Sequence, residues 1–224
     1  MKIIITETQY DSVLNQLNKT ISSVTDPYKM LGITRPSQQS NKPKGMGNRE
    51  PQNVSGKQLM DGSVMNVSER YKSIVREWEG DPKNRVGGVK QPKLKAYRDN
   101  SPGKIPTIGY GHTAGVTMGM KITKQQAEDF LMKDSEDAIN CVKRIMDNWK
   151  KKGLKTYKLT QGQFDAMVSM TFNAGCGSMR QSQFIQELKR GNTKKAAELI
   201  KTFMIGTNVG VKNRRQQEYK LFIS

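Results

Sequence analysis

Two acidic side chains in the middle of the sequence could carry out acid–base chemistry. Glu79 lies four residues after Val75 and directly after Trp78, at the edge of the apolar stripe of an amphipathic pattern. A carboxyl group at an apolar edge loses hydration, which raises its pKa and keeps it protonated near neutral pH, as a general acid requires. The spacing alone leaves open that Glu79 is an ordinary surface carboxylate.

Asp99 could supply the second carboxylate of a pair. It follows Tyr97-Arg98 and begins the turn Asp99-Asn100-Ser101-Pro102-Gly103, so it could simply cap that turn. If it instead faces Glu79 across a cleft, the two carboxyl groups have opposed environments. Such a pair is typical of glycoside hydrolysis.

A helix and a small hairpin must position these two residues. Apolar residues from Val67 to Trp78 recur at helical spacing, Ser68 is the expected N-cap, and Gly80 ends the pattern. Residues 81–93 are rich in Gly, Pro and Lys and are expected to form a loop. Residues 94–112 contain two short strand-like pieces around a Ser-Pro-Gly turn.

The rest of the chain has helical patterns. Capping boxes begin at Thr123 and Thr160, and further helices are expected over about 183–190, 193–203 and 213–222. The predicted fold class is therefore α+β: a small antiparallel β-hairpin lobe and a larger helical lobe.

Composition divides the chain into three parts. Residues 1–34 contain one amphipathic helical pattern after a capping box, and residues 35–66 have the Ser, Gln, Asn, Gly and Pro content of a polar flexible linker. Residues 67–224 form the predicted domain. A lone helix cannot bury a core of its own, so residues 1–66 are a candidate docking segment or tether.

The net charge of the chain bears on the class of molecule that it binds. The 224 residues carry 38 Lys and Arg against 20 Asp and Glu, a formal net charge of +18 that favours an anionic partner. The sequence contains no zinc finger, RNA-recognition aromatic motif or basic zipper. The charge is compatible with nucleic acid, an acidic membrane surface or an anionic cell-wall polymer, and it does not choose among them by itself. Because the nucleic-acid motifs are missing, no nucleic-acid partner is predicted.

Several other classes are excluded. No run approaches the ~18 apolar residues of a membrane span, and the N-terminal residues lack a secretory h-region, so no stable membrane insertion is expected. The single histidine, His112, excludes a multi-histidine metal site and is expected to be structural; no metal or cofactor is predicted. Cys141 and Cys176 are most simply buried small side chains in a reducing compartment, although a bond between them stays open.

Several motifs in order resemble the phage-type (T-even) lysozymes, family 24 of the glycoside hydrolases. The segments that carry the likeness are Trp78-Glu79-Gly80, Leu94-Lys95-Ala96-Tyr97-Arg98-Asp99, Thr107-Ile108-Gly109-Tyr110-Gly111-His112-Thr113, Leu159 to Ser169 with Phe172-Asn173-Ala174-Gly175, and Asn213 to Glu218. The resemblance covers about residues 68–224. It implies a lysozyme-like fold with the active-site cleft between the hairpin lobe and the helical lobe.

The resemblance also implies roles for single residues. Glu79 matches the proton donor, Asp99 the second carboxylate, and Thr107 the threonine that helps to hold the attacking water. Thr113 and Phe172 match positions that contact the substrate. The implied substrate is the β-1,4 bond between N-acetylmuramic acid and N-acetylglucosamine in peptidoglycan, cleaved with inversion by a water that Asp99 activates.

One segment departs from the family pattern. The step from Glu79 to Asp99 is 20 residues, longer than the family usually has, and the surplus is the basic segment 81–93. Loop insertions cost little free energy, so the fold should tolerate it. The rim of the cleft is where the insertion is expected to act, by narrowing access or gripping an anionic part of the wall.

The leading functional hypothesis is a monomeric phage endolysin, a muramidase that waits in the host cytoplasm and acts on the cell wall. The alternatives are a virion-associated tail lysozyme, or a wall-binding protein, held to a partner through residues 1–66. A lytic transglycosylase is disfavoured because its chemistry needs no second carboxylate such as Asp99.

Overall fold

The computed structural model describes residues 56–206 and 209–224 of the 224-residue chain. The helix predicted within residues 1–34, and the predicted linker up to residue 55, lie outside the described residues. The described residues all belong to one compact unit, Gly45–Ser224.

Helix α3 (Glu69–Glu79) brings the first predicted acidic residue into place. Ser68 caps its N-terminus, as expected, by accepting a hydrogen bond from the Arg70 N–H. Ser68 also donates its own N–H and hydroxyl to the buried carboxylate of Asp165. Glu79 is the last helical residue. Gly80 follows it, and an added Cβ there would lie only 2.6 Å from Lys90 Cβ, so a larger residue would need the chain to shift.

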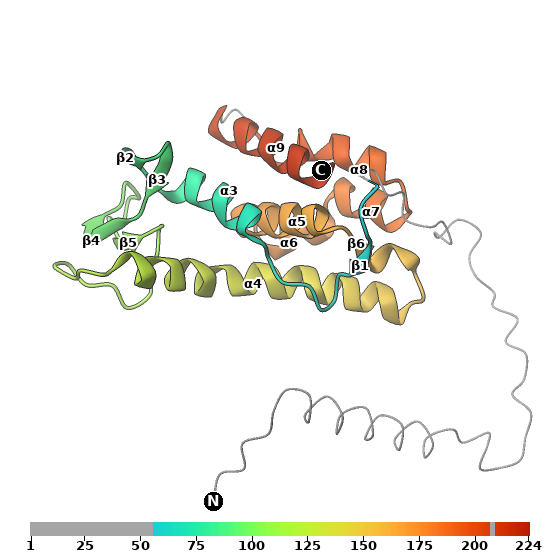
Figure 1. Cartoon of the computed structure of the whole chain (residues 1–224), viewed down its shortest axis with the longest axis horizontal. Helices are drawn as coiled ribbons and strands as arrows, with labels where there is room; N and C mark the ends of the chain where they lie inside the picture. The colour runs from blue at the N-terminus through green and yellow to red at the C-terminus, as the bar shows by residue number, and fades with distance from the viewer. Residues whose placement is uncertain (1–55, 207–208) are drawn as a thin grey trace, which may run out of the picture. The chain divides into compact units, whose positions relative to one another are not determined.

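The small lobe consists of two antiparallel hairpins (Figure 1). Strands β4 (Lys93–Arg98) and β5 (Pro106–Gly109) form the predicted hairpin, with Tyr97 opposite Thr107. Strands β2 (Asp81–Val86) and β3 (Val89–Gln91) form a second hairpin.

This second hairpin corrects the prediction of a loop over 81–93. The turn residues Gly87 and Gly88 both have positive φ, as a two-residue hairpin turn requires. Arg85 and Lys90, one on each strand, both pair with Glu77 of α3. These tertiary contacts support a hairpin whose sequence lacks the apolar alternation of a strand.

The larger lobe is helical. Helix α4 (Lys124–Lys151) runs along its base, and α5 (Gln161–Ala174) is the central helix, with residues 162–171 all buried. Both predicted capping boxes, at Thr123 and Thr160, are present. The remaining elements are η1 (Lys155–Tyr157), β6 (Lys158–Leu159), α6 (Cys176–Gln181), α7 (Gln183–Lys189), α8 (Thr193–Ile200) and α9 (Val209–Phe222).

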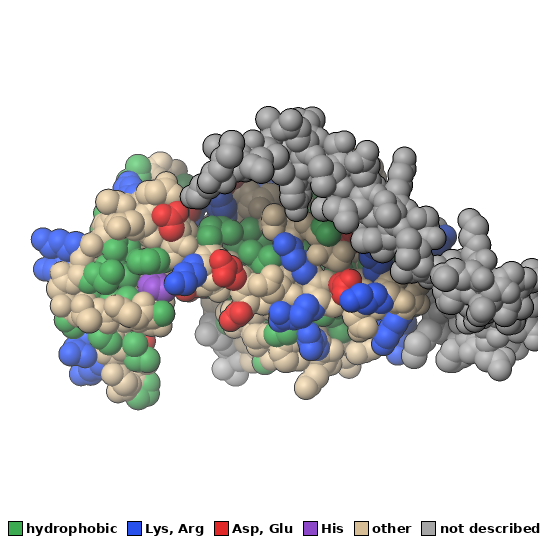
Figure 2. Space-filling view, turned by 90° about the horizontal axis from the view of Figure 1, so that it is seen from below, with side chains coloured by type: hydrophobic (Ala, Val, Ile, Leu, Met, Phe, Trp, Pro, Cys, Tyr) green, Lys and Arg blue, Asp and Glu red, His purple; other side chains and the backbone are tan. Residues whose placement is uncertain are grey.

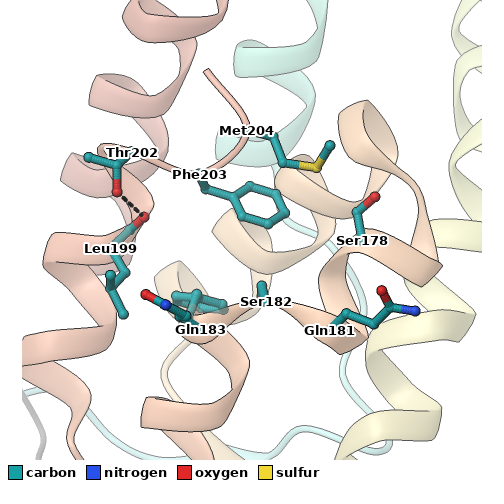
Figure 3. A pocket seen from close by; sticks show the side chains of 9 residues that line it. Ser178, Gln181, Ser182, Gln183, Leu199, Thr202, Phe203 and Met204 are labelled. Atoms are coloured by element: carbon teal, nitrogen blue, oxygen red, sulfur yellow. Dashed lines mark hydrogen bonds between the residues drawn. The ribbon is translucent and has the colours of Figure 1, made fainter. Parts of the chain in front are cut away.

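The larger lobe has a face with many basic side chains and a cavity with an uncharged lining. Figure 2 shows Lys and Arg side chains spread over the face that α4 forms. A cavity of about 370 Å³ between α6, α7 and α8 has an uncharged lining that includes Gln181, Gln183 and Phe203 (Figure 3). Within residues 56–206 and 209–224, no helix has the length and apolar character needed to cross a membrane.

The folded part begins earlier than composition indicates. Strand β1 (Met60–Asp61) pairs with β6, and Met65 is buried, although both lie within the predicted linker 35–66. Asn66 accepts a hydrogen bond through its carbonyl oxygen from Gln161. Residues 60–66 are therefore integrated into the helical lobe through strand pairing, which a polar composition does not reveal.

Cys141 on α4 and Cys176 at the start of α6 form a disulfide, with 5.9 Å between their Cα atoms. The simplest interpretation of the sequence, two separate buried thiols, is therefore wrong. The bond closes a loop of 35 residues that contains η1, β6 and α5. It ties the central helix region to the base of the lobe.

Removal of this bond should lower the free energy of unfolding. Replacing both residues, Cys141→Ala with Cys176→Ala, should cost about 2–4 kcal/mol, because the unfolded chain regains the freedom that closing this loop removes. Urea unfolding followed by circular dichroism measures the change. A reducing agent should destabilise the parent chain and leave the double variant unchanged; equal midpoints for the oxidised and reduced parent chain would contradict the prediction.

Candidate active site

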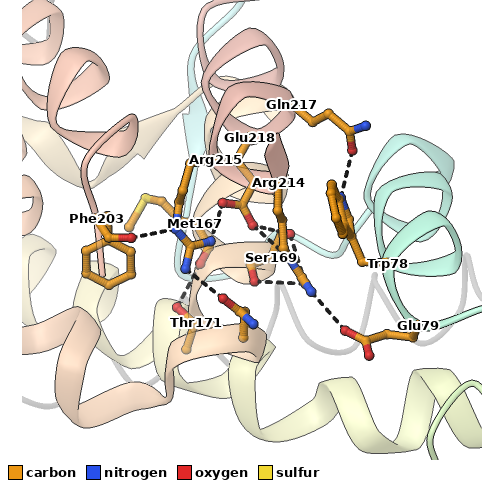
Figure 4. A network of polar contacts seen from close by, with 11 residues as sticks. Trp78, Glu79, Met167, Ser169, Thr171, Phe203, Arg214, Arg215, Gln217 and Glu218 are labelled. Atoms are coloured by element: carbon orange, nitrogen blue, oxygen red, sulfur yellow. Dashed lines mark hydrogen bonds and ion pairs between the residues drawn. The ribbon is translucent and has the colours of Figure 1, made fainter. Parts of the chain in front are cut away.

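Glu79 lies at the end of α3 and is 31% exposed. Its Oε1 accepts a hydrogen bond from Arg214 Nη1 on α9 at 2.8 Å (Figure 4). The sequence pattern predicted apolar surroundings for this carboxyl group, but the structure places a guanidinium against it. The Oε2 atom accepts no hydrogen bond from any described residue, so it is the oxygen available to a substrate.

Arg214 is itself held by a buried polar network. Its side chain is 3% exposed and donates from Nε to Glu218 Oε1 at 3.2 Å, and more weakly to Ser169 of α5. Glu218 is fully buried and also accepts hydrogen bonds from Arg215 and from the Ser169 hydroxyl (Figure 4). The position of Glu79 thus depends on contacts between α3, α5 and α9.

A second contact fixes the same helix end. Trp78 donates its indole N–H to Gln217 Oε1 at 2.8 Å, one helical turn from Arg214 on α9. Arg214 and Gln217 lie in the segment Asn213 to Glu218, which carries part of the family likeness, but the sequence pattern gives neither of them a role. A partly buried carboxylate is expected to have a cationic partner, but the sequence does not show which Lys or Arg that partner is.

Asp99 both caps its turn and keeps one oxygen free. Its Oδ1 accepts hydrogen bonds from the Ser101 hydroxyl at 2.6 Å, from the Ile105 N–H at 2.8 Å and from the Ser101 N–H at 3.3 Å. These bonds, the Ser101 hydroxyl first, lower the pKa of Asp99. No described residue donates to Oδ2. Turn capping and a catalytic role are therefore compatible, since they use different oxygens.

Tyr97 lies within electrostatic reach of both candidate carboxylates. Its pKa is raised, first by burial and then by the negative charges of Asp99, Asp81 and Glu79. Its cross-strand partner Thr107 is 4% exposed and donates its hydroxyl to the Ile105 carbonyl at 2.9 Å. Glu79 and Asp99 thus both contribute to the raised pKa of Tyr97, a residue to which the sequence pattern gives no role, and Thr107 lies opposite it in the hairpin.

His112 joins the small lobe to α4. It is 5% exposed, its Nδ1 lies 2.9 Å from Asp134 Oδ1, and its ring stacks on Phe130 with 4.2 Å between centroids. This agrees with the structural role expected of it. The only histidine of the chain thus has Asp134 and Phe130 of α4 as its partners.

The two predicted substrate-contacting residues lie beyond this group. Thr113 is exposed, next to His112, and Phe172 lines a cavity of about 410 Å³ between α4 and α5. Asp134 lines that cavity too and contacts His112, so it connects the surroundings of both residues. None of Glu79, Asp99 or Thr107 lines this cavity or the uncharged one of Figure 3.

Comparison with known proteins identifies similar chains. The family described as phage lysozyme matches residues 87–218, a stretch that includes Asp99 and Thr107 but begins after Glu79. The endolysin of Bacillus phage PZA is 35% identical over 71% of this chain and 56% of its own length. The endolysin of Acyrthosiphon pisum secondary endosymbiont phage 1 is 32% identical over 71% of this chain and 99% of its own length.

A solved structure supports the same likeness. The endolysin from Escherichia coli O157:H7 phage FAHEc1 superposes with a TM-score of 0.54 at 32% identity, over 71% of this chain and 94% of that chain. The predicted α+β, lysozyme-like fold is confirmed. The chain spans a little over half the length of the Bacillus phage endolysins that it matches.

The buried network yields a stability prediction. Glu218→Ala should lower the free energy of unfolding by about 3–5 kcal/mol, because two buried guanidinium groups then lose their carboxylate. Glu198→Ala is the matched control on α8, since its ion pair with Lys201 is exposed and should matter little. Chemical denaturation measures both, and similar losses in the two variants would show that the network does not stabilise the lobe.

Proposed function

This chain belongs to the phage lysozyme family, and from that premise we propose that it is an endolysin, a muramidase that hydrolyses peptidoglycan. The proposed target is the β-1,4 bond between N-acetylmuramic acid and N-acetylglucosamine. The observation that carries the proposal is that Glu79 and Asp99 are each held through one carboxylate oxygen, while no described residue donates to the other oxygen.

Glu79 is the proposed general acid. Arg214 holds Oε1, which leaves Oε2 to donate a proton to the oxygen of the departing sugar. The guanidinium also stabilises the carboxylate that forms once the proton has left. The ion pair with Arg214 therefore favours the state that follows proton transfer, and it fixes the direction of the Glu79 side chain.

Asp99 is the proposed base. The bonds to Ser101 and Ile105 keep the Asp99 carboxylate ionised and immobile, so Oδ2 can take a proton from water as that water attacks the sugar. The Thr107 hydroxyl donates to a carbonyl, and its oxygen remains an acceptor that can orient the same water. An inverting reaction of this kind requires carboxyl groups about 6.5–9.5 Å apart.

The acid assignment has a closely matched control. Glu79→Gln should lower the rate of cell-wall clearing by roughly 10²–10⁴-fold or more, because Gln cannot donate the proton. Glu77→Gln should leave the rate near that of the parent chain. Glu77 lies two residues earlier on the same helix, is 33% exposed against 31% for Glu79, and also pairs with an arginine, Arg85.

Turbidity of permeabilised bacteria and release of reducing ends measure the rate, and circular dichroism checks the fold. Normal clearing by Glu79→Gln, or equal losses in the two variants, would rule out Glu79 as the acid. Anhydro-muropeptides among the products would show that the chain is a lytic transglycosylase and not a hydrolase.

The pH profile tests Asp99. Because the Ser101 hydroxyl is the largest cause of its lowered pKa, Ser101→Ala should raise that pKa toward its ordinary value. A base with a raised pKa becomes protonated earlier as the pH falls. The acid limb of kcat/KM should therefore move to higher pH.

Ser63→Ala is the matched control, since Ser63 makes the same hydroxyl bond to Asp61, at 2.6 Å, away from the carboxylate pair. Its acid limb should coincide with that of the parent chain. An unmoved limb in Ser101→Ala would mean that Asp99 is not the base whose titration the profile reports.

Residues 1–59 are proposed to form an accessory segment. We propose that residues 1–34 dock on a partner protein or on the folded domain through their amphipathic pattern, with 35–59 as the connection. The proposed setting is the host cytoplasm before lysis, with the chain acting as a monomer on the wall.

A further inference from the structure

A cavity of about 360 Å³ lies between α4, α6 and α7, and none of the proposed catalytic residues lines it. Three cationic side chains line it: Arg144, Arg180 and Lys189. The amide side chains of Asn148 and Gln186 and the indole of Trp149 also contribute. It is thus a concave site with positive charge and hydrogen-bond donors at one place.

The three cations are not compensated within the described part of the chain. No acidic side chain lines the cavity, and neither arginine nor Lys189 makes an ion pair with a described carboxylate. Nearby cations do have partners, such as Lys151 with Asp147 and Arg190 with Glu187. Three unpaired like charges repel one another, and an anion bound between them would remove that repulsion.

The disulfide brings the two arginines together. Arg144 lies three residues after Cys141 on α4, and Arg180 lies four residues after Cys176 on α6. In a helix such spacings place side chains on the same face, one turn apart. The bond between the cysteines therefore joins the two helices one turn from each arginine, and both arginines line the same cavity.

The cavity adjoins the region of the proposed substrate. Arg144 also lines the cavity that contains Phe172, so the two cavities share a wall. The acidic residues of that area, Asp134 and Asp137, line only the Phe172 cavity. The charged side chains that line the Phe172 cavity are therefore of both signs, whereas those that line the neighbouring cavity are all positive.

We propose that the Arg144–Arg180–Lys189 pocket binds a phosphate group of an anionic wall polymer, a polyol phosphodiester, and so retains the protein on the wall that it cuts. This inference rests on the proposed function for its setting. Guanidinium groups match phosphate oxygens in pairs of parallel hydrogen bonds, and the amides of Asn148 and Gln186 can donate further ones.

Two features favour the wall polymer over other phosphates. The exposed large apolar residues of the described chain, such as Val64, Met118 and Met204, lie outside the pocket, so no apolar surface would enter a bilayer there. Trp149 is only 4% exposed and offers no open ring for a nucleic-acid base to stack on. A polyol chain needs neither feature.

The experiment uses the full-length chain carrying Glu79→Gln, so that walls are not digested during binding. Titration with polyglycerol phosphate, followed by tryptophan fluorescence and by calorimetry, gives the Kd. Adding Arg144→Gln and Arg180→Gln should raise that Kd roughly 100-fold, about tenfold for each guanidinium lost. Both arginines are exposed, so the fold should persist, and thermal unfolding checks it.

Lys194→Gln with Lys220→Gln is the matched control, because it removes the same net charge from exposed positions on α8 and α9. Its Kd should rise at most about threefold at 0.15 M salt, where distant surface charges are screened. Equal losses in the two double variants would overturn the pocket in favour of general charge attraction.

Three further probes separate the sources of phosphate. Inorganic phosphate, vesicles of phosphatidylglycerol and a single-stranded oligonucleotide are titrated under the same conditions. Binding of the vesicles or the oligonucleotide as tight as that of polyglycerol phosphate, and equally dependent on Arg144 and Arg180, would overturn the wall polymer as the ligand.

Hydrolysis of soluble muropeptides by the chain with Glu79 intact separates the two proposals. Arginine-dependent polymer binding without hydrolysis supports the pocket and refutes the muramidase. Hydrolysis without arginine-dependent binding refutes the pocket alone.

Discussion

The carboxylate of Glu218, buried between the guanidinium groups of Arg214 and Arg215, is the interaction on which the position of Glu79 depends. Removing a carboxylate from water is expensive, and two charge-assisted partners together with the Ser169 hydroxyl offset that cost. The same arrangement orients Arg214 toward the end of α3. One buried network therefore packs α9 on α5 and sets the direction of the proposed acid.

Helix α3 is held at both ends by polar contacts to helices distant in the sequence. Ser68 at its start binds Asp165 of α5, and Trp78 and Glu79 at its end bind Gln217 and Arg214 of α9. Asp99 belongs to the other lobe, whose hairpin is joined to α4 by the contact of His112 with Asp134. The two carboxylates thus belong to separately anchored parts of the structure.

Local rules explain why much of the fold could be predicted. The N-cap at Ser68 and the capping boxes at Thr123 and Thr160 use side chains within three residues of the backbone groups that they satisfy. Such caps can therefore be predicted from the sequence. The hairpin of β2 and β3 was missed because its strands carry polar residues and are stabilised by ion pairs to Glu77. Strand β1 was missed because only two of its residues pair.

The sequence by itself determined the α+β class, most helix boundaries and the hairpin that follows Asp99, because period, capping and turn chemistry act over a few residues. Glu79 and Asp99 were candidates from their positions in these patterns, and Thr107 from the family resemblance. Only the tertiary structure decided what surrounds them. Arg214 lies 135 residues from Glu79, and Cys141 lies 35 residues from Cys176. Partners at such separations follow no period, since packing of the lobes, and not the local chain, brings them together.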